Sequence, residues 1–220
     1  MYGNEIRLLG DEAGKYGIEL SERQLVLFQV YLDELWAWNQ RTNLTGLSNR
    51  QRIAFELFLD SLIPAPFLAE AGRLLDVGSG AGFPGIPLKI YRPGLVVHLL
   101  ESNAKKGSFL KHIVRLLKLT KTAIIRGRIE GAEDHLHPEG YHMIATRALA
   151  RLGQAVAWCV PKLSSGGLFV SYLGRRAEDE IKENRQILEE HRLVLHKVVP
   201  YTLPGIPFER KAVIFAKKEG

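Results

Sequence analysis

The sequence predicts an α/β fold in which a largely parallel sheet carries helices on both faces. From Arg73 onward, short apolar runs alternate with helical patterns, a spacing that is typical of parallel strands joined by right-handed crossovers. The last two apolar runs, over 193–204 and 211–218, are separated only by a short Pro/Gly turn. We therefore expect the chain to end in a hairpin and the last strand to run antiparallel in the sheet.

Before this alternation, residues 1–70 have the pattern of helices alone. Helical patterns cover three stretches there: 5–16, 21–38 and 49–63. The second begins with a capping box formed by Ser21 and Gln24, and its apolar residues recur every three or four positions on one face. The third should end before Pro64. The sequence thus predicts a helical segment over 1–70 that packs on a domain over 71–220.

Within the domain over 71–220, hydrophobic periodicity places the strands and helices. Besides the two strands of the hairpin, strands are expected at 73–77, 95–100, 122–126, 141–146 and 167–173. Helices are expected between them and before the hairpin, at 85–91, 104–118, 129–136, 151–161 and 177–191. In an open sheet of this kind ligands bind at the carboxyl ends of the strands, so a site is expected in the turns that follow them.

The composition is that of a soluble globular protein. Of its 220 residues, 46% are hydrophobic and 25% are charged, and the N-terminus carries acids without an apolar h-region. We expect a cytoplasmic monomer with no membrane partner. The single cysteine excludes an internal disulfide, and the seven histidines form no ligand pattern, so no metal is expected. The apolar surroundings of Cys159 predict a buried thiol without a catalytic role.

A basic stretch over 102–129 contains no Asp or Glu, and the whole chain has a net charge of +6. Its cationic residues are Lys105, Lys106, Lys111, Arg115, Lys118, Lys121, Arg126 and Arg128. Such a stretch of charged residues most often forms a solvent-exposed face of a helix. An acid-free run of this length favours contact with a nucleic acid. Lys111, Arg115 and Lys118 are spaced to share one face of the expected helix.

The turn after the first strand, "DVGSGAGFPGIPL" at 76–88, combines four glycines with two prolines. From Gly80 it has the G-x-G-x-x-G spacing of dinucleotide-binding turns, and Glu101 follows where such proteins place an acid for the ribose. The prolines argue against a dinucleotide, because a pyrophosphate binds the free N–H groups at the start of the next helix. Pro84 and Pro87 have no N–H group to offer.

A nucleoside ligand without phosphates fits this turn better. Asp76, at the strand end, repels a phosphate and attracts a cation. S-adenosylmethionine carries an ammonium group and a positively charged sulfur, and we expect Asp76, Gly78 and Gly80 to face its amino-acid part. Glu101 is expected to accept both ribose hydroxyls. The turn therefore favours a methyl donor over NAD, which is the alternative, and the absence of G-K-[ST] excludes a P-loop.

Several motifs, in order along the chain, carry a resemblance to a known family. They are "WNQRTNLT" at 38–45, "LDSL" at 59–62, "DVGSGAGFPGIPLKIYRPGLVVHLLESNAKKGSFLKHI" at 76–113, "GRIE" at 127–130 and "ATRALA" at 145–150. Over about 20–175 the sequence resembles the bacterial small-subunit rRNA guanine-N7 methyltransferases, the glucose-inhibited division protein B family. The resemblance implies a Rossmann-like, seven-stranded methyltransferase sheet behind an N-terminal helical segment, with S-adenosylmethionine as cofactor.

The resemblance also implies individual contacts and a substrate. Residue by residue, the resemblance implies cofactor contacts from Gly78, Phe83, Ile129, Glu130 and Arg147. It implies 16S rRNA or the small ribosomal subunit as partner and guanine N7 as the methylated atom. Two positions depart from the family, because Leu57 replaces a common His and Leu173 replaces a common Lys. Arg175 and Arg176 follow shortly after and are candidates to supply the missing charge.

Arg147 is the candidate catalytic residue, because it follows the apolar "MIA" at the carboxyl end of a strand. We expect it to pair with Glu130, with the cofactor's carboxylate, or with the phosphate or O6 of the substrate. A structural ion pair with an acid at the sheet edge is the alternative interpretation of this arginine. Two rival functions are a small-molecule methyltransferase, which would not need the basic stretch, and a non-catalytic RNA-binding module, which would not need the intact glycine turn.

Overall fold

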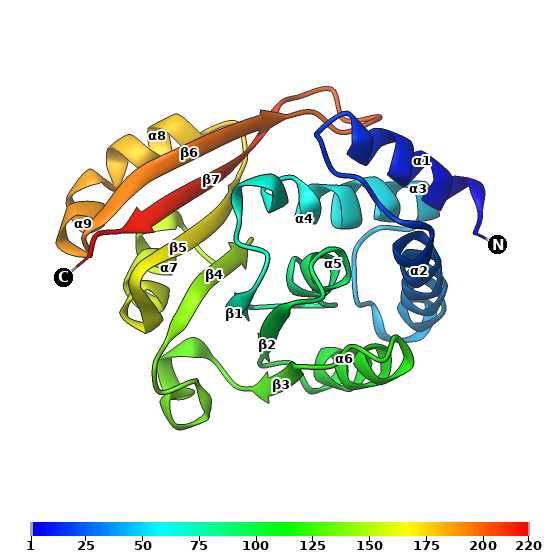
Figure 1. The fold of residues 1–220 in the computed structure, drawn as a ribbon, viewed down its shortest axis with the longest axis horizontal. Helices are drawn as coiled ribbons and strands as arrows, with labels where there is room; N and C mark the ends of the chain where they lie inside the picture. Colours follow the sequence, from blue (N-terminus) through cyan, green and yellow to red (C-terminus); the bar gives the residue numbers. More distant parts are fainter. Residues whose placement is uncertain (1, 220) are drawn as a thin grey trace.

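The computed structural model describes residues 2–219, which form a seven-stranded sheet with helices on both sides (Figure 1). The strands lie in the order β3-β2-β1-β4-β5-β7-β6. Their bounds are β1 Gly72–Val77, β2 Leu95–Glu101, β3 Thr122–Arg126, β4 Tyr141–Arg147, β5 Leu163–Leu173, β6 Leu193–Tyr201 and β7 Arg210–Lys217. Strands β1 to β5 pair in parallel, whereas β7 runs antiparallel to both β5 and β6. The expected α/β class and antiparallel last strand are confirmed.

The strand order reverses between β1 and β4. The chain winds outward from β1 through β2 to β3, then returns to place β4 on the other side of β1. The carboxyl ends of β1 and β4 therefore lie side by side, with Val77 opposite Thr146 in the register. This switch point is where open α/β sheets bind their ligands.

Each face of the sheet has its own apolar cluster, because successive strand residues point to opposite faces. On β1, Leu74 belongs to one cluster and Leu75 to the other. The first cluster packs under α1 Asn4–Gly14, α2 Glu22–Thr42, α5 Gly85–Tyr91 and α6 Ala104–Leu116. The second packs under α7 Leu152–Cys159, α8 Ala177–Glu183 and α9 Arg185–Glu190. The N-terminal helices thus share one core with the sheet, and Figure 1 shows α1 and α2 on the same side of it as α5 and α6.

The helix expected over 49–63 is one continuous helical stretch with a π-helical turn in its middle. It consists of α3 Arg50–Ile53, η1 Ala54–Leu59, which is the π-helical turn, and α4 Asp60–Leu62. The side chain of Asn49 caps its start by accepting from the amide of Arg52. Glu56 and Asp60 lie on the side that faces β7, where both carboxylates accept hydrogen bonds from Arg210. π-helical turns are frequent at functional sites.

Three expected helices differ from the observed ones. The helix expected over 129–136 was wrong: the chain forms two short 3-10 turns instead, η3 Ile129–Gly131 and η4 Glu133–His135. Gly131 inside this short segment and Pro138 just beyond it disfavour an α-helix. The helix expected over 177–191 is divided at Asn184 into α8 and α9. Helix α6 ends at Leu116, so Lys118 lies in the following turn with a φ of 52°.

Short 3-10 turns, η2 Ala65–Phe67 and η5 Val160–Lys162, precede β1 and β5.

None of the helices in residues 2–219 has the length and apolarity needed to cross a membrane. Within the same residues, no group of three or more His, Cys, Asp or Glu side chains is placed to hold a metal ion.

Candidate active site

The glycine turn that follows β1 is closed by its own backbone. The carbonyl of Ser79 accepts from the amides of Gly82 at 2.7 Å and Phe83 at 2.8 Å. Gly78, Gly80 and Gly82 have φ values of 75°, 60° and 107°, which residues with a Cβ rarely adopt. Tyr31 of α2 holds the turn from outside by donating to the carbonyl of Ala81 at 2.6 Å. The helical segment thereby fixes the turn's conformation.

Helix α5 begins directly after the turn, but its first amides are not available to a ligand. Pro84 precedes the helix and has no N–H, and the amide of Gly85 donates to Oδ2 of Asp76 at 2.8 Å. A Cβ at Gly85 would lie 2.7 Å from that oxygen, so the approach requires glycine. Since a pyrophosphate needs free amides at this point, the geometry argues against a dinucleotide.

The Asp76 side chain is directed into the protein interior, where it accepts a hydrogen bond from the start of α5. Its side chain is fully buried, and its Oδ1 makes no hydrogen bond within residues 2–219. Burial raises the pKa of this carboxyl to about 7, against the lowering effect of the Gly85 amide. Asp76 is not among the residues that line the adjoining pocket, and its expected contact with the amino-acid part of the cofactor stays a prediction.

The raised pKa of Asp76 predicts how stability depends on pH. The folded state holds this proton from about pH 4, where an unfolded Asp loses it, to about pH 7. The free energy of unfolding should therefore fall as the pH rises through that interval. Asp76→Asn keeps an acceptor for Gly85 and removes the titration, so its stability relative to wild type should grow by roughly 2 to 4 kcal/mol across the interval. Urea unfolding at several pH values measures this difference, and a constant difference would contradict it.

Glu101 lies at the end of β2, beside the glycine turn. Its Oε2 accepts from the amide of Gly80 and its Oε1 from the amide of Asn103, both at 2.7 Å. The side chain of Asn103 in turn caps α6 by accepting from the amides of Lys105 and Lys106. Each carboxylate oxygen keeps a second lone pair, which is what a ribose diol needs. Glu101 thus ties the glycine turn to the start of α6 in addition to its expected role.

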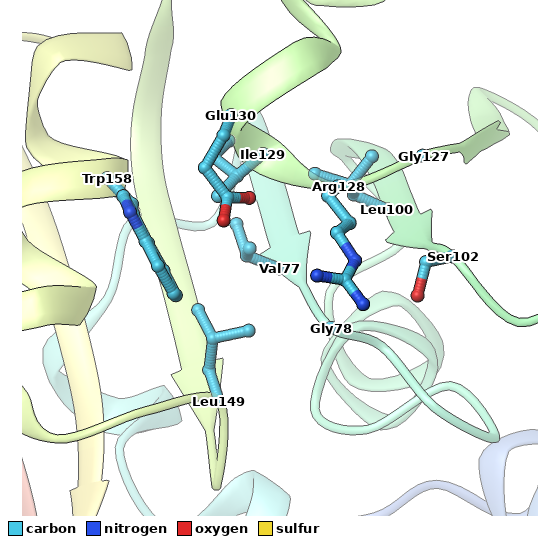
Figure 2. Close-up of a pocket in the computed structure, with 10 residues that line it drawn as sticks. All are labelled: Val77, Gly78, Leu100, Ser102, Gly127, Arg128, Ile129, Glu130, Leu149 and Trp158. Carbon is cyan, nitrogen blue, oxygen red and sulfur yellow. The ribbon is translucent and has the colours of Figure 1, made fainter.

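A pocket of about 220 Å³ opens next to the turn (Figure 2). It is lined by Val77, Gly78, Leu100, Ser102, Gly127, Arg128, Ile129, Glu130, Leu149 and Trp158. Figure 2 shows the Trp158 ring and Leu149 on one side and the Arg128 guanidinium, directed toward Gly78, on the other. The walls combine apolar side chains with Ser102 and Arg128, and the Glu130 carboxylate projects between them. A flat, neutral ring with polar substituents fits such a lining.

Only some of the expected cofactor residues line this pocket. Gly78, Ile129 and Glu130 do, whereas Gly80 and Glu101, which are joined to each other by a hydrogen bond, are not in the lining. Sequence reasoning missed Leu149 and Trp158 as part of the lining. Leu149 had a signal, since it lies in the "ATRALA" motif, but Trp158 comes from α7 and reaches the pocket only through helix packing.

Phe83 and Arg147 lie together on the other side of the turn. The guanidinium carbon of Arg147 is 5.7 Å from the centre of the Phe83 ring, in a cation–π arrangement. Phe83 also stacks on Tyr31 and Phe58, with ring centres 5.5 and 5.8 Å away. The helical segment therefore positions Arg147 through an aromatic layer.

The acid that pairs with Arg147 is Asp60, which the sequence analysis had not singled out. Nη1 of Arg147 is 3.4 Å from Oδ2 of Asp60, whose Oδ1 accepts from Tyr201 at 2.7 Å and Arg210 at 3.0 Å. Glu130, the acid expected from the sequence, lines the other pocket instead. Nη1 of Arg147 is buried and makes no hydrogen bond within residues 2–219. Nη1 is the nitrogen that faces Asp60, and the rest of the guanidinium, in a side chain that is 21% exposed, remains available to a ligand.

Two further sequence expectations concern Cys159 and the basic stretch. Cys159 is completely buried, and burial raises the pKa of its thiol to about 12, so it is a core residue. Of the eight cationic residues in the basic stretch, all but the half-buried Lys106 are exposed. None of the eight forms an ion pair with another residue in the described part of the chain. Their charge is therefore free to act on a partner.

Comparison with known proteins identifies the family. Residues 24–207 match the family described as rRNA small subunit methyltransferase G. The chain is 37% identical over 205 residues to the ribosomal RNA small subunit methyltransferase G of Desulfitobacterium hafniense, covering 93% of this chain and 85% of the relative. It is 39% identical to the protein of the same name from Chloroflexus aggregans, covering 93% and 87%.

Solved structures of methyltransferases share the fold. The structure of M. jannaschii TYW2 in complex with AdoMet matches with a TM-score of 0.57 at 18% identity, covering 73% of this chain and 72% of that one. A putative O-methyltransferase from Klebsiella pneumoniae matches with a TM-score of 0.58 at 16% identity, covering 86% and 90%. Together with the matched family and its relatives, these findings show that the chain is a methyltransferase and belongs to the rRNA small subunit methyltransferase G family.

Proposed function

We propose that this protein transfers a methyl group from S-adenosylmethionine to N7 of a guanine in 16S rRNA. The observation that carries the proposal is the pocket beside the glycine turn, in a chain of this family, where the amides of α5 are unavailable to a phosphate. We further propose that the enzyme acts as a cytoplasmic monomer, and that the helical segment over 1–70 braces the site of the domain over 71–220.

The residues present fit S-adenosylmethionine. The apolar walls suit an adenine ring, Glu101 retains lone pairs for the ribose, and Gly78 gives the close backbone approach that the amino-acid part needs. We propose cofactor contacts from Gly78, Gly80, Phe83, Glu101, Ile129, Glu130 and Arg147. The cofactor supplies a methyl group on a positively charged sulfur, which leaves as a neutral thioether.

Guanine N7 as the acceptor needs neither a base nor a nucleophile from the protein. Guanine N7 has a free lone pair and no proton, so the N–C bond forms as the C–S bond breaks and the bonding pair stays on sulfur. The positive charge passes from sulfur to the base, and no proton has to be removed. Placement and electrostatics therefore suffice. The buried thiol of Cys159 and its raised pKa agree with a reaction that needs no covalent enzyme intermediate.

Binding of the cofactor is tested by thermal unfolding. S-adenosylmethionine and S-adenosylhomocysteine should raise the melting temperature, because a ligand that binds only the folded state stabilises it by about 2.7 kcal/mol at a hundredfold excess over Kd. NAD should have no effect, since the amides that would bind its pyrophosphate are occupied or missing. A shift with NAD and none with the methyl donor would overturn the proposed function.

The basic stretch is the proposed binding surface for the RNA backbone. Reversing Lys111, Arg115 and Lys118 to Glu should weaken RNA binding and reduce the slope of log K against log salt by about one unit for each phosphate that is no longer neutralised. Reversing Lys182, Arg185 and Arg192, which lie on or next to α8 and α9, changes the net charge equally and serves as the control. The affinity for the cofactor should not change in either variant. An unchanged salt slope would indicate that the basic stretch is only a solvent-exposed face and does not bind the RNA backbone.

A further inference from the structure

A second pocket, of about 370 Å³, lies on the other side of the loop that follows β4. Arg147 and Ala148 line this second pocket, whereas the next residue, Leu149, lines the pocket beside the glycine turn. Ala148 has a φ of 51°, a left-handed conformation that is uncommon for alanine. Three consecutive residues thus form the partition between two pockets at the switch point of the sheet. A methyl donor in the first pocket and an acceptor in the second would meet at this partition.

The second pocket presents the guanidinium of Arg147 and no free carboxylate. Asp60 lies in its wall, but both carboxylate oxygens are already engaged by Tyr201, Arg210 and Arg147. The hydroxyl of Tyr172 is also engaged, since it donates to the carbonyl of Ser61 at 2.7 Å. The Arg147 side chain is 21% exposed, and apart from Nη1, which faces Asp60, its guanidinium nitrogens form no hydrogen bond or ion pair within residues 2–219. A ligand that fits here offers acceptors on the edge that it presents.

The rim of the pocket carries a second cationic layer. The guanidinium carbon of Arg175 lies 4.2 Å from the centre of the Phe208 ring, and that of Arg210 lies 5.8 Å from it. Arg175 is exposed and forms no ion pair with a residue in 2–219, whereas Arg176 pairs with Asp179 and Glu183. Of the two arginines that follow the departure at Leu173, Arg175 is therefore the one whose charge is available at the rim.

We propose that this second pocket holds the target guanine, with O6 accepting from Arg147 and a neighbouring RNA phosphate near Arg175. This inference rests on the proposed function. The Hoogsteen edge of guanine offers O6 and N7 as acceptors and no donor, whereas adenine places an N6 amino group there. Donation to O6 alone leaves the N7 lone pair free to react. The donors of the pocket thus select the base, and the partition over 147–149 sets where it meets the methyl group.

Gly174 permits a test that leaves the protein core untouched. It lines the second pocket, it is exposed, and a Cβ built on it meets no atom within 4 Å. Gly174→Leu should fill the pocket and lower the single-turnover methylation rate roughly 100-fold. Gly14→Leu is the matched control and should keep the wild-type rate, because its Cβ also meets nothing within 4 Å and it lies in α1. The Kd for S-adenosylmethionine should be the same in both variants as in wild type.

The assignment of O6 is tested with wild-type protein and altered RNA. At the guanine that wild type methylates, inosine keeps both O6 and N7, whereas 2-aminopurine keeps N7 and lacks O6. Inosine RNA should be methylated at about the guanine rate, and 2-aminopurine RNA should be methylated roughly tenfold or more slowly. Equal rates for 2-aminopurine and guanine would overturn the assignment of O6, and a wild-type rate for Gly174→Leu would overturn the pocket. In both cases methylation of unaltered RNA by wild type would leave the proposed function standing.

Discussion

Arg147→Lys is expected to fold and to lose roughly 100-fold or more of its methyl-transfer rate. Lysine keeps the charge that Asp60 requires, so the ion pair at the sheet edge survives. It loses the planar fork of the guanidinium, which can face Asp60 with one nitrogen and donate to an acceptor with another, so the acceptor is no longer oriented. Single-turnover methylation at saturating cofactor and RNA measures the rate.

Arg147→Ala should lose affinity for the cofactor or the RNA in addition to rate. It leaves Oδ2 of Asp60 without its cationic neighbour, although Tyr201 and Arg210 still donate to Oδ1. Arg185→Lys is the control, since Arg185 forms an exposed pair with Glu189 and should tolerate the exchange. If both Arg147 variants fold and methylate at the wild-type rate, Arg147 is only the structural partner of Asp60.

Gly78→Val should abolish the thermal shift that S-adenosylmethionine produces. Gly78 has a φ of 75°, which a β-branched residue strongly disfavours, and a Cβ there would lie 3.0 Å from Cδ1 of Leu149. The added side chain would also occupy the wall of the pocket. Calorimetric titration measures the loss of binding, and Gly14→Val, at a glycine of α1 with open space around it, is the control. Undiminished affinity in Gly78→Val would place the cofactor elsewhere.

Much of the fold could be predicted from periodicity, because each strand carries its own apolar run. The hairpin of β6 and β7 was readable for the same reason. Elements whose conformation depends on their neighbours could not be predicted from the sequence. The segment after Arg128 has helix-forming residues, but Gly131 and the packing of Ile129 and Ala132 against the sheet leave it as short turns. The π-helical turn over Ala54–Leu59 has no sequence signature of its own.

The site shows the same division between local signals and packing. Gly78 and the residues after β3 could be placed because motifs lie at strand ends, where the fold dictates their position. The pairing of Arg147 with Asp60 joins residues far apart in the sequence, and it exists because α4 packs across the ends of β4 and β7. The hydrogen bond from the Gly85 amide to Asp76 was not predicted for a similar reason, since it exists only because the turn brings Gly85 back to the buried carboxylate.

The most direct test of the proposed activity is to locate the transferred methyl group. Small ribosomal subunits and naked 16S rRNA are incubated with S-adenosylmethionine labelled on its methyl group, and the RNA is digested to nucleosides and mapped. We predict label in 7-methylguanosine at a single position of 16S rRNA, and none when Arg147→Lys replaces the wild type at equal protein concentration and a short incubation. Label in another nucleoside, or none in rRNA while a small molecule is methylated, would contradict the proposed function.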